Sequence, residues 1–217
     1  MPFDNTLSLR LAAKFPIRQN AWCLSTYQPF LKFFKQRIAV EDIQPGDAKI
    51  GVVLVFTWMQ ATEPKLNCWN HFPRAKTLLL RDRVGRLNAA DIDALKPFVG
   101  GSLLATSTFL HFLNPSRYAI WNTHVARAAY RYSWQQCNQS DRYIEYLDDM
   151  KRLQLHDALR GRVRDAIGSV GKLRSKEFAI SQLGISESMP AGNPPRGDLA
   201  DFSFATEKFV LDISADD

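Results

Sequence analysis

Two short segments of this 217-residue chain contain residues suited to chemistry on a polyanion. The first is Val99-Gly100-Gly101-Ser102, where adjoining glycines can adopt positive φ and let another chain approach the backbone closely. The second is the segment 121–125, where the amide of Asn122 lies two residues before an imidazole. Main-chain N–H groups of the first segment can hold a phosphate, and the amide can orient a water molecule.

The elements around the glycines predict a helical hairpin. Residues 88–98 begin with Asn88, a good helix cap, and continue with apolar residues near helical spacing. Residues 103–113 are mostly apolar and are followed closely by Pro115, which suits a helix that ends there. The glycines therefore lie in a tight helix-to-helix turn, and the second helix offers unpaired N–H groups at its start.

This hairpin, followed by a short motif that opens a helix, resembles the helix-hairpin-helix DNA glycosylases over roughly residues 67–184. In that family the turn binds the DNA backbone through main-chain amides, often with a monovalent cation. The second family signature reads Val-Asp-Thr-His-Val, and residues 121–125 match it as Trp121-Asn122-Thr123-His124-Val125. The resemblance implies a mainly α, two-lobed helical fold with a DNA cleft between the lobes.

The chain departs from the family at the residue that carries the chemistry. The family's Asp stabilises positive charge on the sugar and helps water attack, whereas Asn122 has the same shape without the charge. Bifunctional members also have a Lys just after the turn, where this chain has Ser102 or Leu103, and neither is an amine. The resemblance thus implies a monofunctional enzyme without lyase activity, in which Asn122 positions the attacking water.

A second interpretation of Asn122 is structural. Residues 123–130 have helical propensity, and Asn is among the best helix caps. The two interpretations are compatible, because a capping side chain can also face a cleft.

An enzyme that acts on a base in duplex DNA must hold the extruded base among aromatic and polar groups. The residues expected to line this pocket are Trp58, Trp69, His71, Trp121 and His124. Packing in the core is the alternative for Trp69. His111 lies inside an apolar helix and is expected to be a hydrogen-bonded core residue. The residues expected to contact the DNA backbone are Val99, Gly100, Gly101, Ser102, Arg117 and Arg127.

The charge distribution favours a nucleic-acid partner. Residues 1–185 contain 26 Lys plus Arg against 15 Asp plus Glu, a net charge of +11, whereas residues 186–217 contain 2 against 7, a net charge of −5. A basic body suits a polyanion, since each neutralised phosphate releases counterions. For the basic cluster at 160–176, a solvated helix face is the alternative to a DNA contact.

Other function classes lack support. The four histidines show no metal-ligand spacing, and no glycine-rich nucleotide loop follows a strand, so neither a metal nor a nucleotide cofactor is expected. Three scattered cysteines argue against a disulfide framework. No apolar run is long enough to span a bilayer, and no export signal is evident. We expect a cytoplasmic monomer that binds double-stranded DNA.

The remaining chain is organised around this body. Residues 1–185 are expected to form the helical glycosylase-like unit, with the hairpin at 88–113 and the signature helix at 121–131. Further helices are expected at 27–38, 47–61, 75–83, 142–155 and 160–183. Residues 186–217 form a linker containing Pro and Gly and an acidic tail, which either folds back on the body or serves as a mobile, solubilising end.

The sequence therefore predicts a monofunctional DNA glycosylase that removes a damaged or modified base and leaves an abasic site. The substrate suggested by the resemblance is a hypermodified pyrimidine of phage DNA, with a role in antiviral defence. The alternative is a DNA-binding protein that kept the hairpin and lost the chemistry.

Overall fold

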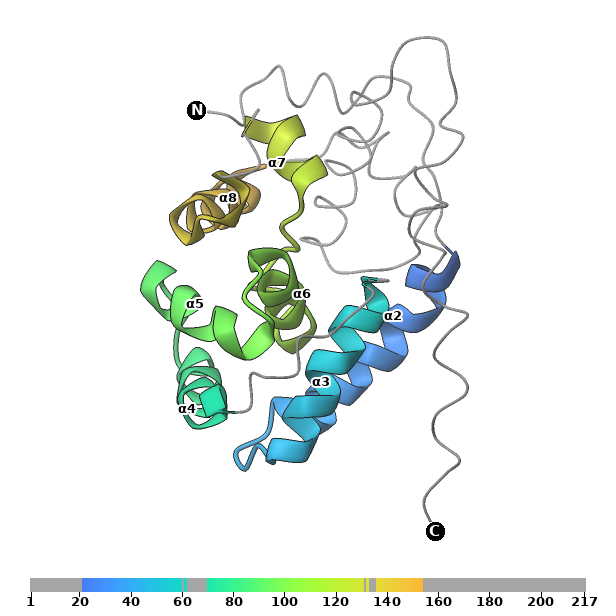
Figure 1. The fold of residues 1–217 in the computed structure, drawn as a ribbon. Helices are drawn as coiled ribbons and strands as arrows, with labels where there is room; N and C mark the ends of the chain where they lie inside the picture. Colours follow the sequence, from blue (N-terminus) through green and yellow to red (C-terminus); the bar gives the residue numbers. More distant parts are fainter. Residues whose placement is uncertain (1–20, 60, 62–69, 131, 133–135, 154–217) are drawn as a thin grey trace.

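The computed structural model describes residues 21–59, 61, 70–130, 132 and 136–153, and this part of the chain is helical (Figure 1). No strand occurs in these ranges. The mainly α class expected from the sequence is therefore confirmed. None of the helices in these ranges has the length and apolar content needed to cross a membrane.

The first layer is a pair of neighbouring helices. Helix α2 (Ala21–Phe33) continues into one π-helical turn, η1 (Phe34–Ile38), and then α3 (Pro45–Trp58) runs beside them (Figure 1). The β-branched run within α3 has residues that are also common in strands, but the segment is the helix expected there, with a proline in its first turn where no N–H is required. Gly51 lets α3 approach Ile38 closely, since a Cβ there would lie 3.3 Å from the Ile38 side chain.

Helix α6 (Leu103–Leu113) is the centre of the fold. It packs against α2, η1 and α3 on one side and, on the other, against the 3₁₀ turn η3 (Lys96–Val99) that follows α5 (Ala89–Leu95) (Figure 1). Helix α4 (Phe72–Asp82) lies beside α5. Nearly every side chain of α6 is buried, including those of its threonines and its histidine, so this helix is apolar all round as a core helix must be.

The last described elements enclose Trp121. Helix α7 (Thr123–Tyr130), the 3₁₀ turn η4 (Gln136–Asn138) and α8 (Ser140–Arg152) follow α6. The Trp121 ring lies 4.9 Å from the Tyr146 ring and 5.9 Å from the Tyr130 ring, centroid to centroid. Aromatic contacts of this kind stabilise the junction between α7 and α8.

His111 is the hydrogen-bonded core residue that the sequence predicts. It is fully buried, with Nδ1 2.9 Å from the Tyr118 carbonyl oxygen and Nε2 2.8 Å from the Tyr27 hydroxyl. Since a carbonyl only accepts, Nδ1 carries the proton and Nε2 accepts from the hydroxyl. The imidazole thereby links α2 to the segment that leads into α7.

A buried carboxylate ties α4 to the same segment. Asp82 is 3% exposed and accepts hydrogen bonds from the Arg117 guanidinium and the Tyr118 hydroxyl. The Tyr118 hydroxyl in turn accepts from the Leu87 N–H at 3.0 Å. Burial, reinforced by the bond to Asp82, raises the pKa of Tyr118 above its usual range. The charge of Asp82 is thus compensated inside the fold.

Candidate nucleic-acid interface

Two helices joined by a turn at the glycines are present where the sequence predicts them, although the first is shorter than expected, since α5 ends at Leu95 and η3 follows it. Asn88 caps α5 by accepting from the Asp91 N–H at 2.9 Å, and the Asp91 carboxylate accepts from the Asn88 N–H at 3.0 Å, so a full capping box is present. Ser102 caps α6, and the helix stops at Leu113, two residues before Pro115. Local signals in the sequence therefore fix both helices and the turn between them.

The glycines of the turn have different roles. Both have φ of +80°, a conformation that other residues rarely adopt. A Cβ on Gly100 would lie 2.7 Å from Phe56 Cζ, so this glycine also allows α3 to pack against the turn. A Cβ on Gly101 would meet nothing within 4 Å, and Gly101 is exposed. The backbone at Gly101 is the part of the turn open to a ligand.

The backbone N–H groups of the turn differ in whether they already donate a hydrogen bond within the protein. The N–H groups of Gly100 and Gly101 both donate to the Lys96 carbonyl, and that of Leu103 donates to Asn138 Oδ1 at 2.9 Å. Within the described ranges, no acceptor serves the N–H groups of Ser102 and Leu104. These two amides, and not those of the glycines, are the donors that remain for a phosphate. Val99 is fully buried and offers only packing.

Asn138 also belongs to this surface, although it is not among the residues expected from the sequence. Its side chain caps the start of α6, and its carbonyl accepts from Lys96 Nζ at 2.7 Å. Lys96 Nζ also lies 2.8 Å from the Asp93 carboxylate. Burial alone would raise the pKa of Asp93, but hydrogen bonds from Lys96 and Ser140 outweigh it and lower that pKa. In the chain, Asn138 lies 42 residues from Lys96 and 35 residues from Leu103. A spacing pattern in the sequence does not predict contacts between residues so far apart.

Asn122 lies beside the first turns of α6. The Trp121 N–H donates to Ser107 Oγ at 3.0 Å, which anchors the residue before Asn122 to α6 one turn after Leu103. Asn122 Oδ1 accepts from the Val125 N–H at 2.9 Å and so caps α7. This bond fixes the amide orientation, because only the oxygen can accept. Asn122 is therefore a helix cap, as its structural interpretation requires. The residue is half-buried, and its NH₂ group has no acceptor among the described residues.

Trp121 lies in an environment that differs from the expected base pocket. The side chain is 1% exposed, and its Nε1–H donates to the Cys137 carbonyl at 2.7 Å. A ring with no open face cannot stack on an extruded base, so Trp121 serves the core. Periodicity does not reveal this, since the residue before a helix cap can face either way.

The other expected pocket residues do not gather around Asn122. Trp58 is buried, and its ring packs edge-on against Phe112. Phe112 lies five residues after Ser107 in α6, and Ser107 is the residue to which Trp121 is bonded. His71 is exposed at the start of α4, while His124 is half-buried in the first turn of α7, two residues after Asn122 in the chain. Trp69 lies outside the described residues. The structure thus brings only His124 close to Asn122 among the described candidates.

The arginines expected at the DNA backbone also differ from that expectation. The Arg117 guanidinium is bound to Asp82, with Nη1 3.1 Å from Oδ1, so its charge is already neutralised. The side chain of Arg127 and the basic cluster at 160–176 lie outside the described part.

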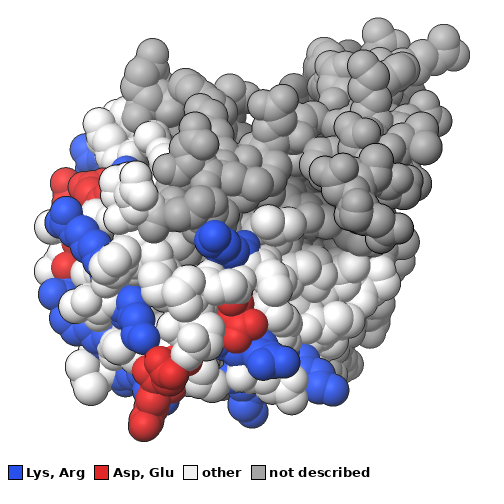
Figure 2. Space-filling model, turned by 60° about the horizontal axis from the view of Figure 1, so that its bottom comes forward, with Lys and Arg blue, Asp and Glu red and all other residues white. Residues whose placement is uncertain are grey.

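Many basic side chains of the described surface are paired with acids. Figure 2 shows Lys and Arg side by side with Asp and Glu along one rim of the molecule. The pairs include Lys76 with Asp42, Arg81 with Asp91, Arg86 with Asp148 and Arg142 with Glu145. In contrast, Lys32, Lys35 and Arg37 of the α2–η1 segment have no acidic partner in the described ranges.

No family model, curated protein or solved structure matches the chain. The described residues contain no group of three or more His, Cys, Asp or Glu side chains placed to hold a metal ion. The described residues offer a positive-φ turn with an exposed Gly101 and two backbone N–H groups that have no acceptor among them. They also offer Asn122, the cap of α7, which follows a residue bonded to Ser107 of α6.

Proposed function

We propose that the protein is a monofunctional DNA glycosylase that removes a damaged or modified base and leaves an abasic site. The observation that carries the proposal is the placement of Asn122. Hydrogen bonds between Trp121 and Ser107 hold it beside the early turns of α6, the helix that the glycine turn opens. A backbone grip and a polar group near the sugar are the parts that base excision requires.

The grip on the DNA backbone comes from the turn. The amides of Ser102 and Leu104 donate to a phosphate at the positive end of α6, and the missing side chain at Gly101 lets the strand approach. The carbonyl groups of Gly100 and Gly101 accept no hydrogen bond from the described residues, so they are suitable oxygen ligands for a monovalent cation shared with that phosphate. These contacts position the duplex without reading its sequence.

The chemistry depends on which hydrogen bonds the Asn122 side chain can still form. Its oxygen already accepts from the Val125 N–H, whereas its NH₂ group has no acceptor among the described residues, so in this proposal the NH₂ group acts, as a donor. Such a donor can hold the attacking water by its oxygen but cannot take the proton of that water. Bond cleavage then depends on a base that departs readily, which favours a modified base over a normal one. The substrate that the family resemblance suggests is a hypermodified pyrimidine of phage DNA whose attached groups help its departure, and this substrate would give the enzyme a defence role.

The alternative is a DNA-binding protein that performs no chemistry. The observation in its favour is the same bond from Val125 to Asn122, which accounts for the asparagine as a helix cap. In this case the turn would bind duplex DNA, but no base would be released.

The experiment that separates the two uses duplexes with normal, damaged and phage-type modified bases. Each duplex is incubated with the full-length protein and then treated with a reagent that cleaves abasic sites. A glycosylase gives strand breaks at one class of modified base. Binding of all the duplexes with no breaks in any of them supports the non-catalytic alternative, and absence of binding overturns both.

A further inference from the structure

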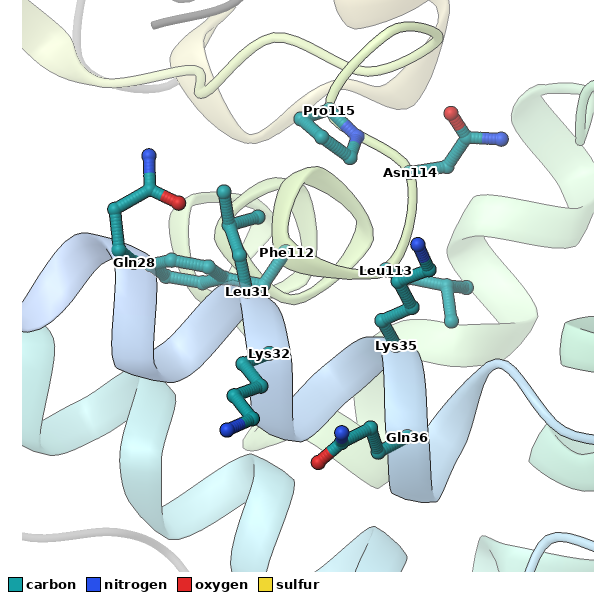
Figure 3. A pocket seen from close by; sticks show the side chains of 9 residues that line it. All are labelled: Gln28, Leu31, Lys32, Lys35, Gln36, Phe112, Leu113, Asn114 and Pro115. Carbon is teal, nitrogen blue, oxygen red and sulfur yellow. The ribbon is translucent and has the colours of Figure 1, made fainter.

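A pocket lies at the other end of α6, away from the glycine turn. Its volume is about 750 Å³, within the usual range for a small-molecule site. It lies between the α2–η1 segment and the end of α6 with the loop after it (Figure 3). Since α6 has 11 residues, the pocket and the glycine turn are about 15 Å apart along the helix.

The pocket combines an apolar surface with uncommitted positive charge. Half-buried Leu31, Leu113 and Pro115 supply the apolar walls, and Phe112 lies buried beneath them. Lys32 and Lys35 come from the other side, are exposed, and have no acidic partner among the described residues. Figure 3 shows the Lys35 side chain reaching towards the end of α6. Lysines beside an apolar wall favour an anion that carries an apolar body.

The same pocket offers hydrogen-bond acceptors at the end of α6. The described residues give no N–H to the carbonyls of Phe112 and Leu113, the last two residues of α6. These carbonyls form the negative end of the α6 dipole. A ligand that fits must therefore place N–H donors at the end of α6 and its anionic group at the lysines.

Amide side chains complete the lining. Gln28 and Gln36 extend from the α2–η1 segment, and Asn114 follows α6 with its oxygen engaged by the Ser116 hydroxyl at 2.7 Å. The glutamine amides can both donate and accept, which matches the edge of a nucleobase. A fatty acid lacks the N–H donors, and inorganic phosphate lacks the apolar body.

We propose that this pocket binds a nucleoside monophosphate. The phosphate lies at Lys32 and Lys35, the base packs on the apolar walls, and its exocyclic amine faces the carbonyl groups at the end of α6. The proposal does not depend on glycosylase activity, since none of its residues belongs to the glycine turn or to the start of α7.

The test is calorimetric titration of the full-length protein with dAMP, dCMP, dTMP, deoxycytidine and inorganic phosphate. We expect dAMP and dCMP to bind, and deoxycytidine and phosphate to bind at least about tenfold more weakly, because each lacks one half of the contacts. dTMP has no exocyclic amine and should bind several-fold more weakly than dCMP. The double variant Lys32→Ala with Lys35→Ala should reduce dCMP affinity by about tenfold or more.

Arg37→Ala is the matched control. Arg37 is an exposed cation of the same segment with no acidic partner among the described residues, yet it does not line the pocket. The proposal expects this variant to bind dCMP with wild-type affinity. It is overturned if dCMP does not bind, if phosphate alone binds as well as dCMP, or if Arg37→Ala weakens dCMP as much as the double variant. Thermal melting verifies that the variants fold.

Discussion

The two ends of the Asn122 amide have different roles. The Asn122 oxygen caps α7, while its NH₂ group has no acceptor among the described residues. Stability and catalysis therefore involve different atoms of the same side chain. Substitutions that keep one atom and remove the other can separate the two roles.

Asn122→Ala should lower the free energy of unfolding by about 1 kcal/mol, the usual contribution of a helix cap. Asn122→Ser should retain most of the stability, since its hydroxyl can accept from the Val125 N–H. Asn122→Asp should be at least as stable as the wild type, because a negative charge is favourable at the start of α7. Urea denaturation measures all three. Equal stability of Asn122→Ala and the wild type would contradict the cap.

A second residue-scale prediction concerns acid stability. The hydrogen bond from Arg86, at 2.6 Å, lowers the pKa of the Asp148 carboxyl in the folded protein. A folded-state pKa below the unfolded value stabilises the fold above the unfolded-state pKa, and this contribution is lost as the pH falls through the folded-state pKa. Arg86→Gln should therefore destabilise the protein at neutral pH and show a shallower loss of stability below about pH 4. Denaturation across pH 2.5 to 7 tests this, and parallel curves would exclude the effect.

At the scale of the element, the hairpin is the best-determined part of the site. Its helix ends were predictable because each is set by neighbours in the chain: the capping box at Asn88, the paired glycines, the Ser102 cap and Pro115. The environment of Trp121 and the contact from Asn138 to Leu103 were not predictable, since they arise where distant segments meet. The pocket at the end of α6 is also non-local, because α2 and α6 each supply one wall.

The two glycines should respond differently to substitution. Gly101→Ala should cost about 1 kcal/mol, from the positive φ alone, whereas Gly101→Asn should cost less because Asn tolerates this conformation. Gly100→Ala should cost about 2 to 3 kcal/mol, since its methyl group would also collide with the Phe56 ring. Thermal or urea unfolding gives the order. Equal losses at both positions would show that packing against α3 is unimportant.

The net charge and the helical fold class of the whole molecule follow from its sequence, but which of its cations are paired with acids does not. The chain carries a net charge of +6, yet many of its described cations are already paired with acids. Those without an acidic partner include Lys32 and Lys35, at the end of α6 opposite the turn. Pairing depends on side chains that meet only in the folded chain, so composition could not reveal it.

This difference leads to a prediction about salt. Amides of the turn release no counterions, whereas a lysine or arginine that meets a phosphate does. Gly101→Ala should weaken duplex binding with no change in the slope of log affinity against log salt. Arg127→Gln should make that slope shallower by about 0.9, if its charge meets one phosphate as the sequence predicts. Fluorescence anisotropy at several salt concentrations measures both, and a changed slope for Gly101→Ala would contradict binding by main-chain amides.

The most direct measurement of the central claim is the release of free base from a modified duplex, followed by mass spectrometry, for the wild type and Asn122→Ser. The serine variant keeps the helix cap but lacks the NH₂ donor. The account predicts that the wild type releases the base while the variant, with near-wild-type stability and DNA affinity, releases it at least about 10²-fold more slowly. Release at the wild-type rate by the serine variant would show that the Asn122 amide takes no part in excision.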